Sequence, residues 1–532
     1  MTSSRSTLRN LFLAVCIALC VASTGAQVPV ESRAEHAFAA AKKAGAPELY
    51  AFLKPFPKGA DLHMHLSGAI YAETFLAEGA NQGLCVDKIA LRFEQPTKPG
   101  ECADGQLLAA DAVKNQGLYD KLINSFSMRS FVPYAGYSAH DQFFDTFDRF
   151  GGLKDMYGDW LFEVASRAAA QNEQYLEIMS TPPFSNAVAA GNKFGWPEDF
   201  SDKNHMAELA KLRDELLANG LRNDIAIDTK QLADAKSVER LTINSHGCDE
   251  FISESASAWP RSACGVKIHY LYQVLRGFSP QQVFAQTLLG FELASVNPDV
   301  VGINFVRAED RRDAMDEYHT EMLMLDYLHS VYPKVRISLH AGELAPGMVP
   351  PDGLSFHIRE AIDLGHAERI GHGIDVLHED RPAELLKQMA DHHVMVEINL
   401  TSNDVILGIK DTDHPLHAYI AAHVPWALST DDEGVSRIDL THEYVKAVVD
   451  QNLTYADLKQ SARTSLEHAF LAGPSLWASP DNFTRRNSAC AASIGTTAFP
   501  PGPCRDFLKT SERATQQYEL ERRFAAFEAA IK

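Results

Sequence analysis

The sequence predicts an α/β chain that folds as a (β/α)8 TIM-type barrel, with helical and loop insertions and a C-terminal helical extension. Eight short apolar runs rich in β-branched residues recur along the chain, and stretches with apolar residues every three or four positions lie between them. Strands that alternate with helices pair in parallel, and eight such units over roughly 410 residues fit a barrel of above-typical size. No repeat of about 20 to 50 residues is present, which sets aside solenoids and propellers.

The expected strands are the apolar runs at 60–66, 175–180, 266–272, 300–306, 335–340, 369–372, 394–399 and 425–430. The clearest expected helices are 160–171, 280–295, 315–332 and 383–392. The excess length falls mainly before the second and third strands, so we expect surface insertions near 84–140 and 183–264.

The two ends of the chain have compositions unlike that of the barrel. Residues 1–26 carry Arg5 and Arg9, then an apolar run at 11–21, then small residues, which is the pattern of a secretory signal peptide. We therefore expect a secreted or periplasmic protein, a helical segment at 27–57 and a barrel at 58–475. A disulfide loop and a helix at 507–531 are expected within 476–532.

Charge and length exclude several classes of protein. The 532 residues are far more than a small binding module needs, and 45% hydrophobic with 22% charged residues is typical of soluble globular domains. A net charge of −21 repels a phosphate backbone, so nucleic acid is not an expected partner. After the signal, no segment approaches the roughly 20 apolar residues of a membrane helix, so no membrane partner is expected.

Six cysteines remain once the signal is removed, and they form three close-spaced couples. Six cysteines allow 15 pairings, but short loops in an oxidising compartment favour sequential disulfides. Free buried thiols are the alternative. The expected pairs are Cys85 with Cys102, Cys248 with Cys264, and Cys490 with Cys504.

Four clusters of ionisable residues stand where predicted strands end. The first strand ends in DLHMHL, and residues two apart on a strand share a face, so His63 and His65 both point into the barrel. HAGE follows the fifth strand, GHG the sixth and STDDEG the eighth. Each has an ordinary structural alternative, such as a helix start, a tight loop or an N-cap with an acidic first turn. All four at the catalytic end of one barrel indicate an active site.

These residue types favour a metal-dependent hydrolytic site. Imidazoles and one carboxylate are the ligands of catalytic zinc, which lowers the pKa of bound water to about 7. Glu343, His372 and Asp432 are then available to move protons and orient the nucleophile. Strand alternation sends Asp431 and Asp432 to opposite faces, so both reach the pocket only if the pleat breaks at the strand end.

The chain resembles the adenosine deaminases of the amidohydrolase superfamily, including their secreted growth-factor-like branch. The resembling motifs are LHMHLSGA, HAGE, RIGHG, VEINLTSN and STDDEG, in the family's order, and they cover most of the chain from about 57 to 470.

The resemblance implies one Zn²⁺ per chain and a role for each matching residue. Glu343 would be the proton donor to purine N1, and Asp432 would hold the attacking hydroxide and purine N7. His372 would be the base or the electrostatic partner of that hydroxide. The implied zinc ligands are His63, His65, His340 and Asp431.

The specificity residues depart from the family pattern. Ser67 stands where the family often has an acidic residue near the ribose, and Arg307 stands where a glycine backbone usually reaches purine N3. Asn399 and Leu400 replace a more usual Cys-Pro. We expect Ser67, Arg307 and Asp432 to contact the substrate, although Arg307 pairing with a surface acid and Ser67 capping a turn are the alternatives.

The expected function is an exported, zinc-dependent deaminase of adenosine or 2'-deoxyadenosine, and the expected partner is a small-molecule purine nucleoside. A related aminohydrolase acting on adenine or a modified purine is the nearest alternative. A non-catalytic extracellular signalling or binding protein on the same scaffold is the alternative from another class. A homodimer is left open.

Overall fold

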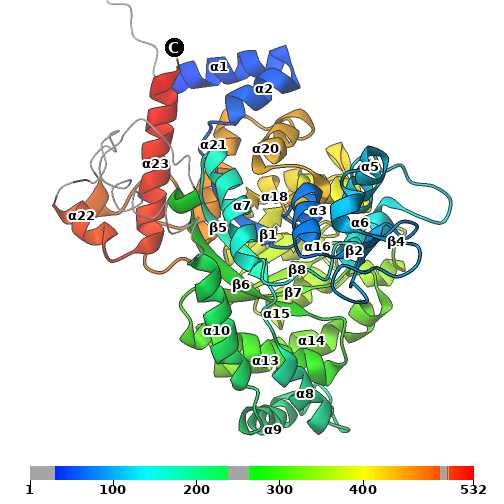
Figure 1. Cartoon of the computed structure of the whole chain (residues 1–532). Coiled ribbons are helices and arrows are strands. Elements are labelled where there is room, and N and C mark those ends of the chain that lie inside the picture. The colour runs from blue at the N-terminus through cyan, green and yellow to red at the C-terminus, as the bar shows by residue number, and fades with distance from the viewer. Residues whose placement is uncertain (1–29, 238–262, 492–499, 501, 532) are drawn as a thin grey trace, which may run out of the picture.

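Eight parallel strands form the centre of the molecule in the computed structural model, which describes residues 30–237, 263–491, 500 and 502–531 (Figure 1). The strand order is β1-β5-β6-β7-β8-β9-β10-β11. The strands are β1 Gly59–His65, β5 Glu173–Ser180, β6 Lys267–Leu275, β7 Val300–Val306, β8 Arg336–Ala341, β9 Arg369–His372, β10 Met395–Ile398 and β11 Trp426–Leu428.

The sheet closes between its first and last strands. Met64 of β1 forms a parallel bridge with Asp431, which follows β11, and the Asp431 N–H donates to the His63 carbonyl at 2.8 Å. Closure of eight parallel strands confirms the predicted (β/α)8 barrel. All eight predicted strands are present, and β6 runs three residues beyond its predicted end.

Helices surround the barrel and cover the outer faces of the strands, which explains why the strands are apolar on both sides. Each of the four clearest predicted helices begins between zero and three residues from its predicted start. Pro280 at the first position of α13 and a capping box between Ser279 and Gln282 explain why that helix starts where it does. The covering helices are α7 Tyr157–Ala170, α13 Pro280–Val296, α14 Arg312–Val331, α15 His357–Asp363, α16 Pro382–Asp391, α18 Leu416–Ala421, α20 Leu440–Val449 and α21 Tyr455–His468. Short turns at the mouth include α17 Leu400–Ser402, a π-helical turn at Asn403–Leu407 and α19 Glu433–Ser436.

The first insertion holds a small antiparallel sheet that the sequence did not predict. The sheet has the order β3-β2-β4, and its three strands are three residues each. The predicted Cys85–Cys102 disulfide ties β2 to the loop between β3 and β4. Its elements are α3 Ala72–Asn81, β2 Cys85–Asp87, β3 Arg92–Glu94, β4 Gln106–Leu108, α4 Ala109–Ala112, α5 Gln116–Ser125 and α6 Ala139–Arg149.

The second insertion is helical within the described residues, with α8 Ser185–Phe194, α9 His205–Ala218 and α10 Asn223–Lys236. These helices pack against α13, which is therefore buried around most of its circumference. Cys248 lies outside the described residues, so its pairing with Cys264 stays a prediction, as does the signal peptide at 1–26.

The first and last described helices meet beside the amino ends of β1 and β5. The C-terminal tail forms two helices, α22 Pro503–Leu508 and α23 Glu512–Ala530, where a single helix over 507–531 was predicted. Ser511 caps α23 by accepting from the Ala514 N–H, so the chain breaks before it. Phe56 packs against Phe524 of α23, and α23 contacts α1 Val30–Ala44, near α2 Ala46–Leu53 (Figure 1). The predicted Cys490–Cys504 disulfide is present.

Within the described ranges, the structure contains no helix that is both long enough and apolar enough to span a membrane.

Candidate metal centre and active site

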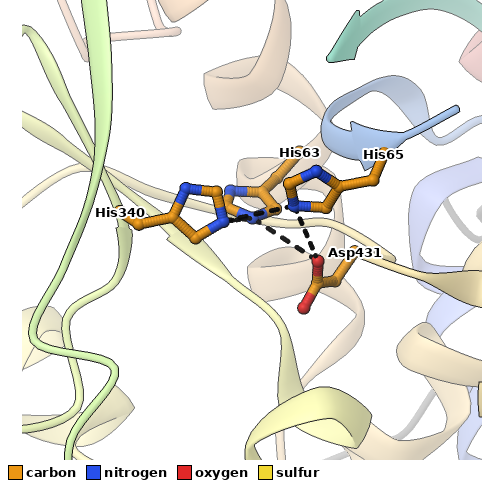
Figure 2. Close-up of side chains that lie close together, drawn as sticks. All are labelled: His63, His65, His340 and Asp431. Carbon is orange, nitrogen blue, oxygen red and sulfur yellow. Dashed lines mark hydrogen bonds and ion pairs between the residues drawn. The ribbon is translucent and has the colours of Figure 1, made fainter. Parts of the chain in front are cut away.

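Four predicted metal ligands meet at the carboxyl end of the barrel (Figure 2). His63 and His65 share one face of β1, and His340 is the second-last residue of β8. Asp431 lies three residues beyond the end of β11 and adopts a left-handed backbone conformation, with φ of 61°. That turn breaks the strand pleat, so Asp431 and Asp432 both line the same cavity.

The donor atoms of these four residues converge on one point. His63 Nε2 and His65 Nε2 lie 3.1 Å and 3.2 Å from His340 Nε2. Asp431 Oδ1 is 3.3 Å from His65 Nε2 and 3.7 Å from His63 Nε2. All four side chains are buried, so water cannot screen these atoms from one another.

The Nδ1 atom of each ligand imidazole forms a hydrogen bond with a side-chain oxygen. Glu397 Oε2 lies 2.6 Å from His63 Nδ1, and Gln273 Oε1 lies 2.6 Å from His65 Nδ1. Asn304 Oδ1 lies 2.8 Å from His340 Nδ1, while the Asn304 amide donates to a backbone carbonyl. Since each Nδ1–H donates to an oxygen, each neutral ring has its lone pair on Nε2. Three lone pairs and a carboxylate oxygen that face one another suit a bound cation.

Glu397 holds a negative charge beside the centre. Burial raises the pKa of Glu397, but the Arg369 guanidinium and hydrogen bonds from His63 and Ser338 outweigh it and hold this pKa at about 2. Arg369 Nε donates to Glu397 Oε1 at 2.6 Å. The carboxylate therefore stays ionised and orients the His63 ring.

Asp431 is oriented by two further contacts at the barrel seam. Ser402 Oγ donates to Asp431 Oδ2 at 2.6 Å, which leaves Oδ1 for the metal side. Asp61 Oδ2 accepts from the Thr430 N–H and hydroxyl, at 3.1 Å and 2.5 Å. These bonds join β1 to the segment after β11 and so bring His63 and Asp431 together.

Glu343, His372 and Asp432 lie beside the four ligands. Glu343 Oε1 is 3.6 Å from His372 Nδ1, and His372 Nε2 is 3.8 Å from Asp431 Oδ2. Glu343 Oε1 and Asp432 Oδ1 are buried without a hydrogen-bond partner in the protein, and both residues line the cavity. Burial raises the pKa of Glu343 well above its usual value, and the Asp431 carboxylate acts in the same direction. Glu343 is therefore suited to donate a proton.

Two glycines in the recognised motifs make room for site residues. A Cβ on Gly371 of the RIGHG motif would come within 2.5 Å of the His63 ring. A Cβ on Gly68 would come within 1.5 Å of Asp432 Oδ1. A side chain at either position would displace a site residue, so both motifs require glycine for close packing.

The cavity above the ligands measures about 840 Å³, within the range of small-molecule sites. Ser67 and Arg307 both line it, as does an aromatic group from α6 and α7 that includes Phe144 and Trp160. Arg307 Nη2 also pairs with Asp313 at 2.6 Å, which is the surface pairing weighed as the alternative role. Arg307 is thus a cavity residue whose charge is partly neutralised.

Several residues that orient the four ligand side chains carry no individual prediction from the sequence. Glu397 and Ser402 lie inside the VEINLTSN motif, which was recognised as a whole without individual roles. Gln273 and Asn304 are neutral polar residues inside apolar strands, and a polar residue at such a position is the signal that could have found them.

The fold and these residues define a (β/α)8 barrel with a candidate metal centre and acid–base residues at its catalytic end. The chain belongs to the adenosine deaminase family, whose model matches residues 140–476. Adenosine deaminases from two strains of Yersinia pseudotuberculosis, IP 31758 and YPIII, are each 36% identical over 139 residues. Those matches cover 26% of this chain and 38% of each relative, so the chain aligns with well under half of their length.

Solved structures with similar folds include the apo N6-methyl-AMP deaminase of Arabidopsis thaliana, at 20% identity and a TM-score of 0.49. That comparison covers 79% of this chain and 94% of the other. The adenine deaminase of Arthrobacter aurescens is 18% identical, with a TM-score of 0.47, covering 78% of this chain and 94% of the other.

Proposed function

We propose that this protein is an exported, zinc-dependent deaminase that converts adenosine or 2'-deoxyadenosine to the 6-oxo purine nucleoside and releases ammonia. The observation that carries the proposal is the convergence of three imidazole Nε2 atoms and Asp431 Oδ1 at the floor of a cavity that also holds Glu343 and Asp432. Membership of the adenosine deaminase family supports the same reaction.

One Zn²⁺ per chain fits the four ligands, since imidazole nitrogens and carboxylate oxygens are donors that zinc binds, and expansion to five ligands leaves room for a water. His63, His65, His340 and Asp431 would hold the ion, which when bound lowers the pKa of water and so provides a nucleophile near neutral pH. Glu397, Gln273 and Asn304 would keep the three rings oriented toward it.

Glu343 would protonate purine N1 as water adds to C6. Its buried, unpartnered Oε1 and raised pKa support this role, because the acid form persists to higher pH than for an exposed glutamate. Asp432 would contact purine N7 and the attacking oxygen, and its free Oδ1 in the cavity supports that placement. His372 would stabilise the attacking oxygen from the side of Asp431.

Adenine or a modified purine is a second candidate substrate, and the observation that favours it is Arg307. A cation stands where the family usually presents a glycine backbone, and Arg307 and Ser67 both line the cavity. Ser67 and Arg307, which would contact the sugar or the purine, therefore differ from the family pattern, whereas the four proposed zinc ligands match it.

Export is proposed from the signal-like residues 1–26 and supported by the two disulfides, because such bonds persist in oxidising compartments. The domain limits of 58–475 for the barrel and 476–532 for the C-terminal part belong to the same proposal.

Ammonia release by purified protein, measured with adenosine, 2'-deoxyadenosine, adenine and AMP, tests the function directly. We expect a preference for the two nucleosides, whereas a preference for adenine would favour the second candidate. No release from any purine would contradict the proposed reaction.

Metal binding is tested by zinc analysis of the same preparation. We expect about one zinc per chain, with loss of metal and activity in His63→Ala. The matched control is His319→Ala, because His319 lies on α14 outside the cavity and pairs with Glu360. Active protein that contains no transition metal would contradict the zinc assignment.

A further inference from the structure

A chain of hydrogen bonds runs from a helix start to the ring of His372, through two residues with no role in the site described above. The first hydrogen bond starts at Leu416, the first residue of α18, whose N–H donates to His414 Nδ1 at 3.1 Å. A backbone N–H can only donate, so His414 Nδ1 must carry a lone pair. The proton of a neutral His414 is then on Nε2.

His414 is neutral because of its surroundings. It is 3% exposed, and burial, assisted by the positive charge of Lys446, lowers its pKa to about 3. His414 therefore has one N–H to donate over the ordinary pH range, and that N–H is on Nε2.

The next link fixes the orientation of an amide. His414 Nε2 lies 3.2 Å from Asn403 Oδ1, and Asn403 Nδ2 lies 2.9 Å from His372 Nδ1. The reverse amide orientation would turn the Asn403 NH2 toward His414 Nε2, which already carries a proton. Asn403 therefore presents its oxygen to His414 and its NH2 to His372.

His372 has no better partner on that side. Glu343 Oε1, at 3.6 Å from Nδ1, is beyond hydrogen-bond distance. Asn399 Nδ2 is 3.5 Å from both ring nitrogens, which places that amide beside the ring and on neither lone pair. Asn403 is therefore the donor to His372 Nδ1. It is fully buried at the start of the π-helical turn Asn403–Leu407.

We propose that Asn403 and His414 are positioning residues that hold His372 as the tautomer with its proton on Nε2. His372 then presents an N–H toward Asp431 and the reaction centre, at 3.8 Å from Asp431 Oδ2. In the reaction proposed above, on which this inference rests, His372 donates a hydrogen bond to the attacking oxygen and does not take its proton. The proton must then pass to another residue, and we assign it to Asp432, a carboxylate that lines the same cavity.

Asn403→Asp tests the chain, because a carboxylate of the same shape can accept from His414 but cannot donate to His372. The His372 proton should move to Nδ1, and kcat should fall about 10²- to 10⁴-fold with KM and zinc content unchanged. His414→Gln is the matched conservative variant, since a glutamine amide can replace the Nε2–H donor. It should keep the tautomer and nearly all of kcat.

The tautomer is read from ¹⁵N chemical shifts of histidine-labelled, zinc-loaded protein, with the His372 signals assigned by their loss in His372→Asn. A proton on Nδ1 in the wild-type protein, or on Nε2 in Asn403→Asp, would overturn the inference. So would an Asn403→Asp enzyme with the proton on Nδ1 and wild-type kcat. The shifts need no turnover, so an inactive wild-type protein would contradict the proposed function separately.

Discussion

Replacing Glu343 by glutamine separates proton donation from every other property of this side chain. Glutamine keeps the shape and fits the same buried position, but it has no acidic proton to give to purine N1. Glu343 Oε1 has no hydrogen-bond partner in the protein, so the change breaks no internal bond through that atom. The His372 ring lies 3.6 Å from Glu343, and Glu343 is not one of the four residues His63, His65, His340 and Asp431 whose donor atoms converge. The metal centre should therefore be preserved.

The expected loss in kcat is about 10²- to 10⁴-fold, the usual contribution of a general acid, which equals about 3 to 5 kcal/mol of barrier. The pH profile should change as well. Because burial raises the pKa of Glu343, its acid form persists to higher pH than that of an exposed glutamate and is lost as the pH rises through the raised value. The alkaline fall in kcat of the wild-type enzyme should therefore be missing in Glu343→Gln.

The assay is steady-state ammonia release across pH, with zinc per chain measured on the same samples. Glu379→Gln is a matched control, since Glu379 is a buried carboxyl with a pKa raised to about 7 that does not line the cavity. It should leave kcat unchanged. A Glu343→Gln enzyme with near-wild-type kcat would refute the role of proton donor, and parallel loss of zinc would recast Glu343 as a structural residue.

Three further changes test other parts of the molecule. Burial and the neighbouring Asp224 raise the pKa of Asp228 from 3.8 to about 8, so folding stability falls as the pH rises from about 4 to about 8. Asp228→Asn should therefore raise the free energy of unfolding at pH 8 by about 1 to 3 kcal/mol. An equal Tm of the two proteins at pH 8 would contradict this. Replacing Cys85 and Cys102 by serine removes a crosslink between residues 17 positions apart and should lower the free energy of unfolding by about 3 kcal/mol, measured by urea denaturation. An unchanged urea midpoint would show that this disulfide adds no stability. Arg307→Gly should shift the ratio of kcat/KM between adenosine, adenine and AMP by about tenfold or more, and constant ratios would leave Arg307 only as a partner of Asp313.

The barrel could be predicted because its strands are buried on both faces, and such strands have continuous apolar sequences. The small sheet of the first insertion could not, since strands of three residues are too short for alternation to appear. The break before α23 has a local signal in Ser511, an N-cap residue followed by a charged helical segment, but the helical periodicity on both sides of it predicts one helix over 507–531.

The candidate site also has a part that the sequence predicts and a part that it does not. Its ionisable residues stand at strand ends, where barrel geometry brings them together, and His340 and Asp431 lie close to the two histidines of the first strand. The residues that orient them, such as Gln273 and Asn304, act through contacts 36 to 208 residues away in the chain. A polar residue inside an apolar strand marks each position as unusual, but the local sequence does not say which ligand that residue contacts, so the pairings come only from the fold.

The seam of the barrel also sets the order in which the proposed metal site can be assembled. His63 and His65 belong to the first strand, whereas Asp431 follows the last, and the bridge between Met64 and Asp431 joins these two ends of the barrel. During synthesis the two histidines appear early, but the fourth ligand appears only after all eight strands. An ion that needs all four ligands can therefore be held only by a chain whose first and last strands have already met, so closure of the barrel comes before metal binding.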